Sequence, residues 1–171
     1  MAKHILSGSN QKRYFARFYL EAIENMEHDE SVINHKALLA AHRESCLFHL
    51  VGAYRCFIWE VANTYDEPYD GSTSLGEFLQ QASDRGKSIS ELQRVYLLES
   101  NQGGWLNDMI RVWQQINQVN PQANSTPKEA VNLNAIEVRV MTDIDEFAQL
   151  HDWYNNLSNM IDEIRQLLSE W

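Results

Sequence analysis

The chain has 171 residues, 44% hydrophobic and 22% charged, which is the composition of an ordinary globular domain and excludes a disordered or membrane-embedded class. Its 24 acidic and 14 basic side chains give a formal charge of −10, and the basic residues form no dense cluster, so we expect no nucleic-acid partner. With only seven glycines and three prolines, long helices are possible almost everywhere.

The first helix is predicted from Ser9, a residue type that caps helices well, through Met26. Its apolar side chains recur every three or four positions, as expected for one buried helical face. They are Phe15, Phe18, Tyr19, Ala22, Ile23 and Met26. The helix is predicted to end at an acidic stretch, residues 27–30.

The second predicted helix is the longest, running from that acidic stretch to Tyr65. It is amphipathic at first, but from Leu47 to Ala62 it is apolar on nearly all sides, which is typical of a helix surrounded by neighbours. Gly52 and Ala53 would let another backbone approach closely. We therefore expect its second half to lie at the centre of a bundle.

Two shorter helices are predicted after the turn-forming residues 66–71. Each begins with the spacing of a capping box, in which a serine and a glutamate three residues later bond each other's backbone N–H. Ser74 with Glu77 forms the first box and Ser88 with Glu91 the second. The first of these helices is the short excursion of the fold.

Residues 135–141 are the only strand-like stretch, because Ile136, Val138 and Val140 alternate with charged residues. A lone strand needs a partner. The segment is therefore either an extended crossover over the bundle or an edge strand that pairs with a second copy of the chain. We favour the crossover.

Two further helices are predicted, one from Trp105 to about Asn120 and one from Thr142 to the C-terminus. The last has the clearest amphipathic pattern of the chain. Its apolar positions are Phe147, Leu150, Trp153, Tyr154, Leu157, Met160, Ile161, Ile164 and Leu168. Together the patterns predict an all-α fold with one domain over residues 1–171, a helical bundle of four main helices with a short excursion and one extended crossover.

The two cysteines predict a reducing compartment. Cys46 and Cys56 lie ten positions apart on one predicted helix, about 15 Å at the standard rise, which is too far for a mutual disulfide. Residues 1–10 contain no secretory signal, so we expect a cytoplasmic protein. The most apolar stretch, Leu47 to Val61, is too short and too polar to span a bilayer, and no membrane partner is expected.

Two short segments resemble a known family. Residues 10–16, Asn-Gln-Lys-Arg-Tyr-Phe-Ala, and residues 47–53, Leu-Phe-His-Leu-Val-Gly-Ala, are similar to the pattern of a small, functionally uncharacterised, all-helical family of proteobacteria. The resemblance covers the first 65 residues best and the last helix loosely. It implies a compact helical protein of about this length, and it brings no activity, ligand or catalytic residue with it.

A stripe of histidines and cysteines on the second helix is the most specific polar pattern. Four histidines recur every seven residues, which keeps them near one helical face. They are His28, His35, His42 and His49. His42, Cys46 and His49 could bind zinc together with a third group such as His151 or Glu60. The alternative is structural, with the imidazoles bonded to carbonyls or carboxylates; because no established zinc motif is present, we favour it and expect no metal or cofactor.

Arg43 and His49 also resemble the short catalytic signature of the HEPN ribonucleases. Those are small helical bundles in which the arginine and histidine of two subunits face each other and cleave RNA. The signature is permissive, it stands here in an early helix, and the chain is strongly acidic. Alternatively, Arg43 pairs with Glu44, Glu60 or a residue of the last helix.

These patterns leave two hypotheses about function. The favoured one is a non-enzymatic, cytoplasmic interaction bundle that binds an unidentified protein, with a second copy of the chain as one candidate. Most of the five tryptophans are expected in the core, and Trp171 is a candidate anchor for a partner. The alternative is a metal-dependent or HEPN-like enzyme centred on His42, Arg43, Cys46 and His49. A concave site with converging polar groups would favour the enzyme, and a flat apolar patch the binding protein.

Overall fold

The computed structural model describes residues 7–27, 34–117 and 146–170, in which every regular element is an α-helix. The helices are α1 (Gly8–Glu27), α2 (His35–Thr64), α3 (Leu75–Asp84), α4 (Ser90–Ser100), α5 (Trp105–Asn117) and α6 (Glu146–Ser169). The all-α prediction is therefore confirmed. The strand-like residues 135–141 and the predicted start of the last helix at Thr142 lie outside the described residues.

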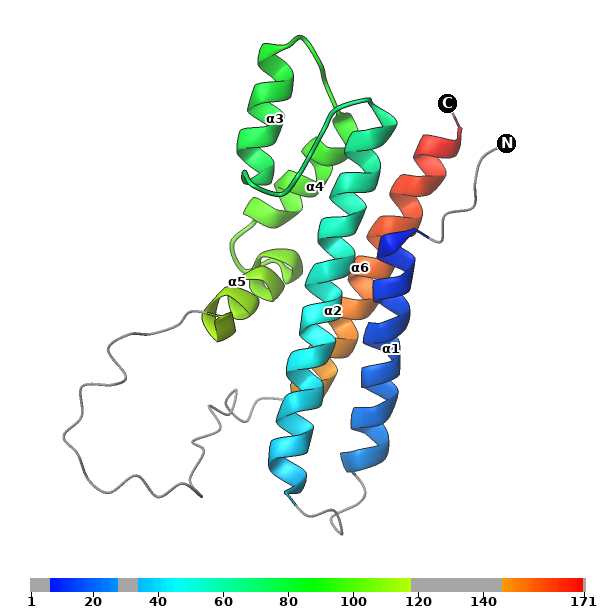
Figure 1. Ribbon diagram of the computed structural model, residues 1–171, viewed down its shortest axis with the longest axis vertical. Helices are drawn as coiled ribbons and strands as arrows, with labels where there is room; N and C mark the ends of the chain where they lie inside the picture. The colour runs from blue at the N-terminus through cyan, green and yellow to red at the C-terminus, as the bar shows by residue number, and fades with distance from the viewer. Residues whose placement is uncertain (1–6, 28–33, 118–145, 171) are drawn as a thin grey trace, which may run out of the picture.

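The three longest helices form the body of the bundle. Helices α1, α2 and α6 pack against one another in pairs, and α1 makes its most extensive contact with α2. Helix α5 packs on α2 and α6, α4 on α2 and α5, and α3 on α4. In Figure 1, α1 and α2 stand side by side with α6 behind them, and α3 to α5 lie along the opposite side of α2 from α1.

Helix α2 passes through the centre of the hydrophobic core, as its apolar second half predicts. Its buried residues are Cys46, Leu47, Leu50, Val51, Ala53, Tyr54, Phe57, Ile58, Val61 and Ala62. However, Phe48 and Trp59 are 49% and 54% exposed, so part of the helix surface is not covered within the described regions. The helix is therefore central but not fully enclosed. Across the described segments, no helix combines the length and the apolar character needed to cross a bilayer.

One of the two predicted capping boxes forms. At the start of α3, the N–H of Glu77 donates to the Ser74 hydroxyl at 3.2 Å, and the N–H of Ser74 donates to the Glu77 carboxylate at 3.0 Å. The second prediction is wrong, because the N-cap of α4 is Ile89, whose side chain makes no cap. There the carboxylate of Glu91 instead accepts a 2.6 Å hydrogen bond from the hydroxyl of Tyr65, at the end of α2.

The predicted cap of the first helix is also displaced. Helix α1 begins at Gly8, and the hydroxyl of Ser7 accepts the N–H of Asn10 at 3.4 Å, whereas Ser9 lies inside the helix. Ser9 is fully buried, and its hydroxyl donates to the carboxylate of Glu60 on α2 at 3.0 Å. The hydroxyl of Ser9, which the sequence pattern predicts as the helix cap, is thus engaged by Glu60 of another helix instead.

Candidate functional site

Cys46, the centre of the predicted metal-binding stripe, points into the interface between α1 and α2. It is fully buried, and its thiol donates to the carbonyl oxygen of Ala16 at 3.6 Å. Burial raises the pKa of Cys46 to about 12. At neutral pH the thiol of Cys46 is therefore protonated, and its side chain packs in the interface between α1 and α2.

The other cysteine should be the reactive one. Cys56 is half-buried, and its pKa is raised by partial burial and by the nearby carboxylate of Glu60, but it lies beside an open hollow. We expect the thiol reagent DTNB at pH 8 to modify wild-type protein at one site, and a Cys56→Ser variant to react only after urea is added. Rapid modification of folded Cys56→Ser protein would contradict the placement of Cys46.

The two histidines of the stripe contact the same ring of α1. Tyr19 stacks on His49 with a centroid distance of 5.5 Å and meets His42 edge-on, also at 5.5 Å. The Nδ1 atom of His42 is bound to the carbonyl oxygen of Leu38 at 2.9 Å, as the structural alternative predicts. Within the described ranges no three metal-ligating side chains come together. The expected third ligands are elsewhere engaged, since His151 packs on Phe147 and Glu60 binds Arg165.

His49 lies among aromatic rings. Phe15 and Phe48 each meet it edge-on at 5.2 Å, in addition to the stacked Tyr19. Its Nδ1 atom is buried and has no hydrogen-bond partner among the residues described, and desolvation and the charge of Lys12 lower its pKa. His49 therefore packs as one ring of an aromatic cluster at the interface between α1 and α2. Arg43 leaves α2 about 120° away from His49 around the helix axis, so one chain does not bring the two together.

The outer surface of α1 carries a group of exposed aromatic residues that we call the α1 ridge. Tyr14, Phe15 and Phe18 are 67%, 37% and 58% exposed. The rings of Tyr14 and Phe15 contact each other at 6.2 Å, and Phe18 leans edge-on against Tyr19 at 5.8 Å. The sequence pattern assigned Phe15 and Phe18 to the buried face, and this assignment is wrong. Ala16 and Leu20 lie on that face instead, together with Ile23, which the pattern correctly placed there.

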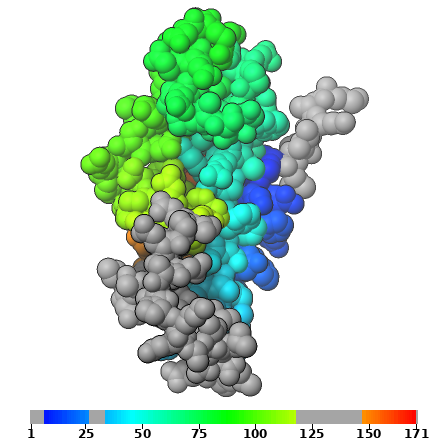
Figure 2. All heavy atoms as spheres, turned by 60° about the vertical axis from the view of Figure 1, so that its left-hand side comes forward, coloured from blue at the N-terminus to red at the C-terminus, as the bar shows by residue number. Residues whose placement is uncertain are grey.

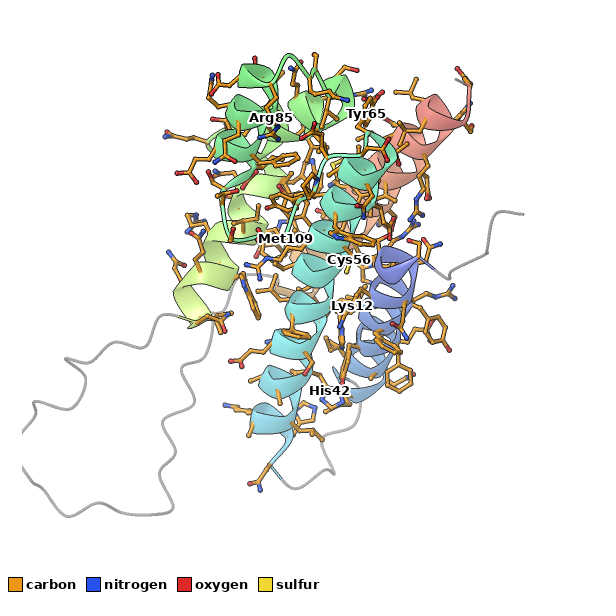
Figure 3. All side chains as sticks on the ribbon, turned by 45° about the horizontal axis from the view of Figure 1, so that its top comes forward. Lys12, His42, Cys56, Tyr65, Arg85 and Met109 are labelled. Carbon is orange, nitrogen blue, oxygen red and sulfur yellow. The ribbon has the colours of Figure 1, made fainter. Side chains whose placement is uncertain are left out.

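A second row of surface positions, in which Ser45 and Gly52 are half-buried and the others exposed, runs along α2, and we call it the α2 stripe. Its members are Ala41, Ser45, Phe48, Gly52, Arg55 and Trp59. Lys12 of α1 borders the stripe, as Figure 3 shows, with its chain reaching between α1 and α2. Its ammonium lies 5.2 Å from the centre of the Phe48 ring, and its Cδ would be 3.4 Å from a Cβ added at Gly52. The stripe therefore combines large aromatic and small residues on one helix face.

Two hollows open beside the α2 stripe, one near each end. The first, about 440 Å³, is lined by Ala41, Ser45 and Phe48 together with Trp113 and Ile116 of α5. The second, about 560 Å³, is lined by Arg55 and Trp59 with residues of the loop after α2 and the start of α1. Figure 2 shows the surface of α2 in cyan between α5 and α1. The first hollow is also bordered by Glu44 and His49, and the second by Cys56 and Glu60, whose carboxylate is engaged by Arg165.

A polar network that the sequence did not reveal joins α1, α2 and α6. The carboxylate of Glu60 accepts hydrogen bonds from the hydroxyl of Ser7, from the N–H and hydroxyl of Ser9, and from the guanidinium of Arg165 at 2.8 Å. Arg165 also donates to Asn10 at 2.6 Å. Burial alone would raise the pKa of Glu60, but these hydrogen bonds outweigh it and hold the pKa below its usual value. The only sequence signal was a single glutamate in an apolar stretch.

Comparisons with known proteins give a family and no function. A family model described as a family of unknown function, DUF6586, matches residues 1–171. No curated protein and no solved structure matches the chain.

Proposed function

Because the chain belongs along its whole length to DUF6586, a family of unknown function, its role must be inferred from its own residues, and we propose that it is a non-enzymatic protein-interaction bundle. The proposed contact surface is the α1 ridge. The proposed partner is another protein that offers an apolar groove to this ridge.

The exposure of the ridge is the observation that carries the proposal. The bundle already has a core of fully buried side chains on all six helices, yet three large aromatic residues of α1 remain in water. Burying an aromatic side chain gains roughly 1.5–3 kcal/mol, so these positions leave a substantial gain for a partner. Tyrosine and phenylalanine are also enriched at the centres of protein interfaces.

The shape and charge of α1 fit this use. Tyr14 and Phe18 are one helical turn apart, which is the anchor spacing of a helix that lies in a groove. The neighbouring cations are neutralised within the bundle, since Arg13 pairs with Asp162 at 2.7 Å and Arg17 with Glu21 at 2.8 Å. An otherwise strongly acidic protein thus presents a nearly neutral aromatic surface here, and docking does not need to bury its negative charge.

A cytoplasmic location remains part of the proposal. Cys46 and Cys56 are both free in the folded chain. Free thiols are the usual state in a reducing compartment. Measuring the distribution of the tagged native protein between cell fractions would test this location directly.

Removing the ridge should weaken partner binding. A Tyr14→Ser/Phe18→Ser variant loses two exposed anchors, each worth about 1–2 kcal/mol at an interface centre, so we expect at least a tenfold weaker affinity. The partner is first captured from extract by wild-type protein and identified by mass spectrometry. Its affinity for purified wild-type and variant bundles is then measured by titration calorimetry.

The matched control is Leu97→Ser. Leu97 is 70% exposed on α4, away from the ridge, and its substitution should leave the affinity unchanged. If the ridge variant binds as well as wild type, or if both variants weaken binding equally, the ridge is not the contact surface.

A further inference from the structure

The spacing of the α2 stripe reads the same in both directions. Its positions are 41, 45, 48, 52, 55 and 59, so the intervals alternate four, three, four, three, four. This is the spacing of the contact seam of two helices packed side by side. If a second α2 lies antiparallel against the first, with a two-fold axis near residue 50, positions 41, 45 and 48 of one copy face positions 59, 55 and 52 of the other.

The side chains on the stripe are complementary in size under this two-fold axis. Trp59, which is 54% exposed, would face Ala41 of the second copy, and Phe48, which is 49% exposed, would face the Gly52 position, beside the methylene chain of Lys12 that lies against this glycine. Large residues placed against small ones interdigitate without gaps. The hollow of about 440 Å³ beside Ala41 lies where the indole would enter, next to Trp113. A parallel pair would instead place Trp59 against Trp59 and leave Gly52 facing Gly52.

The charges are complementary in the same register. Glu44 and Arg55 are exposed, and among the described residues neither forms an ion pair. Because they are eleven positions, or about three turns, apart, their side chains lie on nearly the same side of the helix. The antiparallel arrangement brings Glu44 of each copy beside Arg55 of the other, so the contact contains this pair twice. In a parallel arrangement like charges would meet.

From these observations we propose that the α2 stripe is the interface of a homodimer, in which two copies pack antiparallel with Trp59 over Ala41, Phe48 over Gly52 and Arg55 beside Glu44. Ala41, Phe48, Arg55 and Trp59 of the stripe are exposed in the described part of the chain, and α1 and α5 pack on α2 on opposite sides of it (Figure 1). The two-fold axis makes each copy provide both halves of every contact, as closed dimers require. This dimer is separate from the proposed function, in which the α1 ridge binds a different protein, and the two surfaces share no residue.

Charge reversal in trans tests the dimer and its register together. Wild-type protein should sediment as a dimer at micromolar concentrations. Glu44→Arg alone places two arginine pairs across the interface, and Arg55→Glu alone places two glutamate pairs, so each variant should dissociate at least tenfold more readily. An equimolar mixture of the two should form a heterodimer with an affinity within about threefold of wild type, because both pairs are then opposite in charge.

Three results would overturn the proposal: a wild-type protein that is monomeric up to about 100 µM, single variants that dimerise like wild type, or a mixture that fails to recover. Lys87→Glu, an exposed reversal away from α2, should change nothing. Far-UV circular dichroism verifies that each variant is folded. An independent second test exchanges the two side-chain sizes: the double variant Ala41→Trp/Trp59→Ala should dimerise, whereas Trp59→Ala alone should not. Glu44→Arg should still bind the partner of the α1 ridge, so the two proposals fail separately.

Discussion

Phe57→Ala is expected to lower the free energy of unfolding by about 3–5 kcal/mol, the usual cost of deleting a buried phenylalanine ring. Phe57 is 1% exposed and belongs to the single hydrophobic cluster that joins all six described helices. The loss has two parts, the transfer free energy of the ring and the cavity that remains because the long, central α2 cannot collapse locally. The variant should therefore unfold at a much lower urea concentration.

Urea titrations followed by circular dichroism measure the effect, with Phe18→Ala as the matched control. Phe18 is the same residue type but is 58% exposed on the α1 ridge. Its replacement loses an edge contact with Tyr19 and gains the better helix propensity of alanine, so the free energy of unfolding should change by less than about 1 kcal/mol. Similar losses for both variants would mean that the core does not centre on the second half of α2.

Glu60→Gln is the second substitution with a large expected effect, about 1–3 kcal/mol less stability at pH 7. It removes the charge that accepts hydrogen bonds from Arg165, Ser7 and Ser9 where α1, α2 and α6 meet. Arg165 would then be left partly buried beside a neutral amide. Ser9, in the first turn of α1, would also lose a charge-assisted acceptor for its N–H.

The effect should depend on pH in a definite direction. The folded-state pKa of Glu60 lies below its usual value, so the ionised network stabilises the fold above the unfolded-state pKa of about 4.3. This contribution is lost as the pH falls through the lower, folded-state pKa. The stability difference between wild type and Glu60→Gln should therefore be full at pH 6–7 and shrink at pH 3.

A surface ion pair supplies the comparison for this experiment. Glu163 meets Arg94 at 3.2 Å, but both side chains are more than half exposed, at 62% and 57%. Glu163→Gln should cost less than about 1 kcal/mol, because water and salt screen such pairs. Equal effects of the two substitutions, or a Glu60→Gln loss that persists unchanged at pH 3, would show that the network does not stabilise the fold as an ionised cluster.

The helices could be predicted from the chain because helical periodicity is a local property. The starts of α1, α3 and α5 lie within a residue or two of the predicted positions, and the Ser74–Glu77 capping box forms because its two side chains need only each other. The expected membership in an uncharacterised family is likewise confirmed, because DUF6586, a family of unknown function, matches residues 1–171. These signals all lie within short stretches of the chain.

The site was harder to predict, because helical spacing does not show which side of a helix its neighbours cover. Phe15 and Phe18 fit an apolar face as well as Ala16 and Leu20 do, yet only the latter pair is buried. The stripe of His42, Cys46 and His49 was correctly placed along one side of α2, but the packing of α1 buries its thiol and stacks Tyr19 on an imidazole. Of these three side chains, only Cys46 belongs to the hydrophobic core.

The amino-acid sequence by itself determined the class of the fold, the position of α2 at its centre and the membership in a family of unknown function. Only the tertiary structure decided which aromatic residues remain in water and that Glu60 finds Arg165, 105 positions away along the chain. Periodicity shows only that a segment is helical and which of its residues share a face. Exposure and long-range ion pairs depend instead on how helices distant in sequence are arranged around one another. The α1 ridge and the α2 stripe, on which both proposed interactions rest, are products of that arrangement.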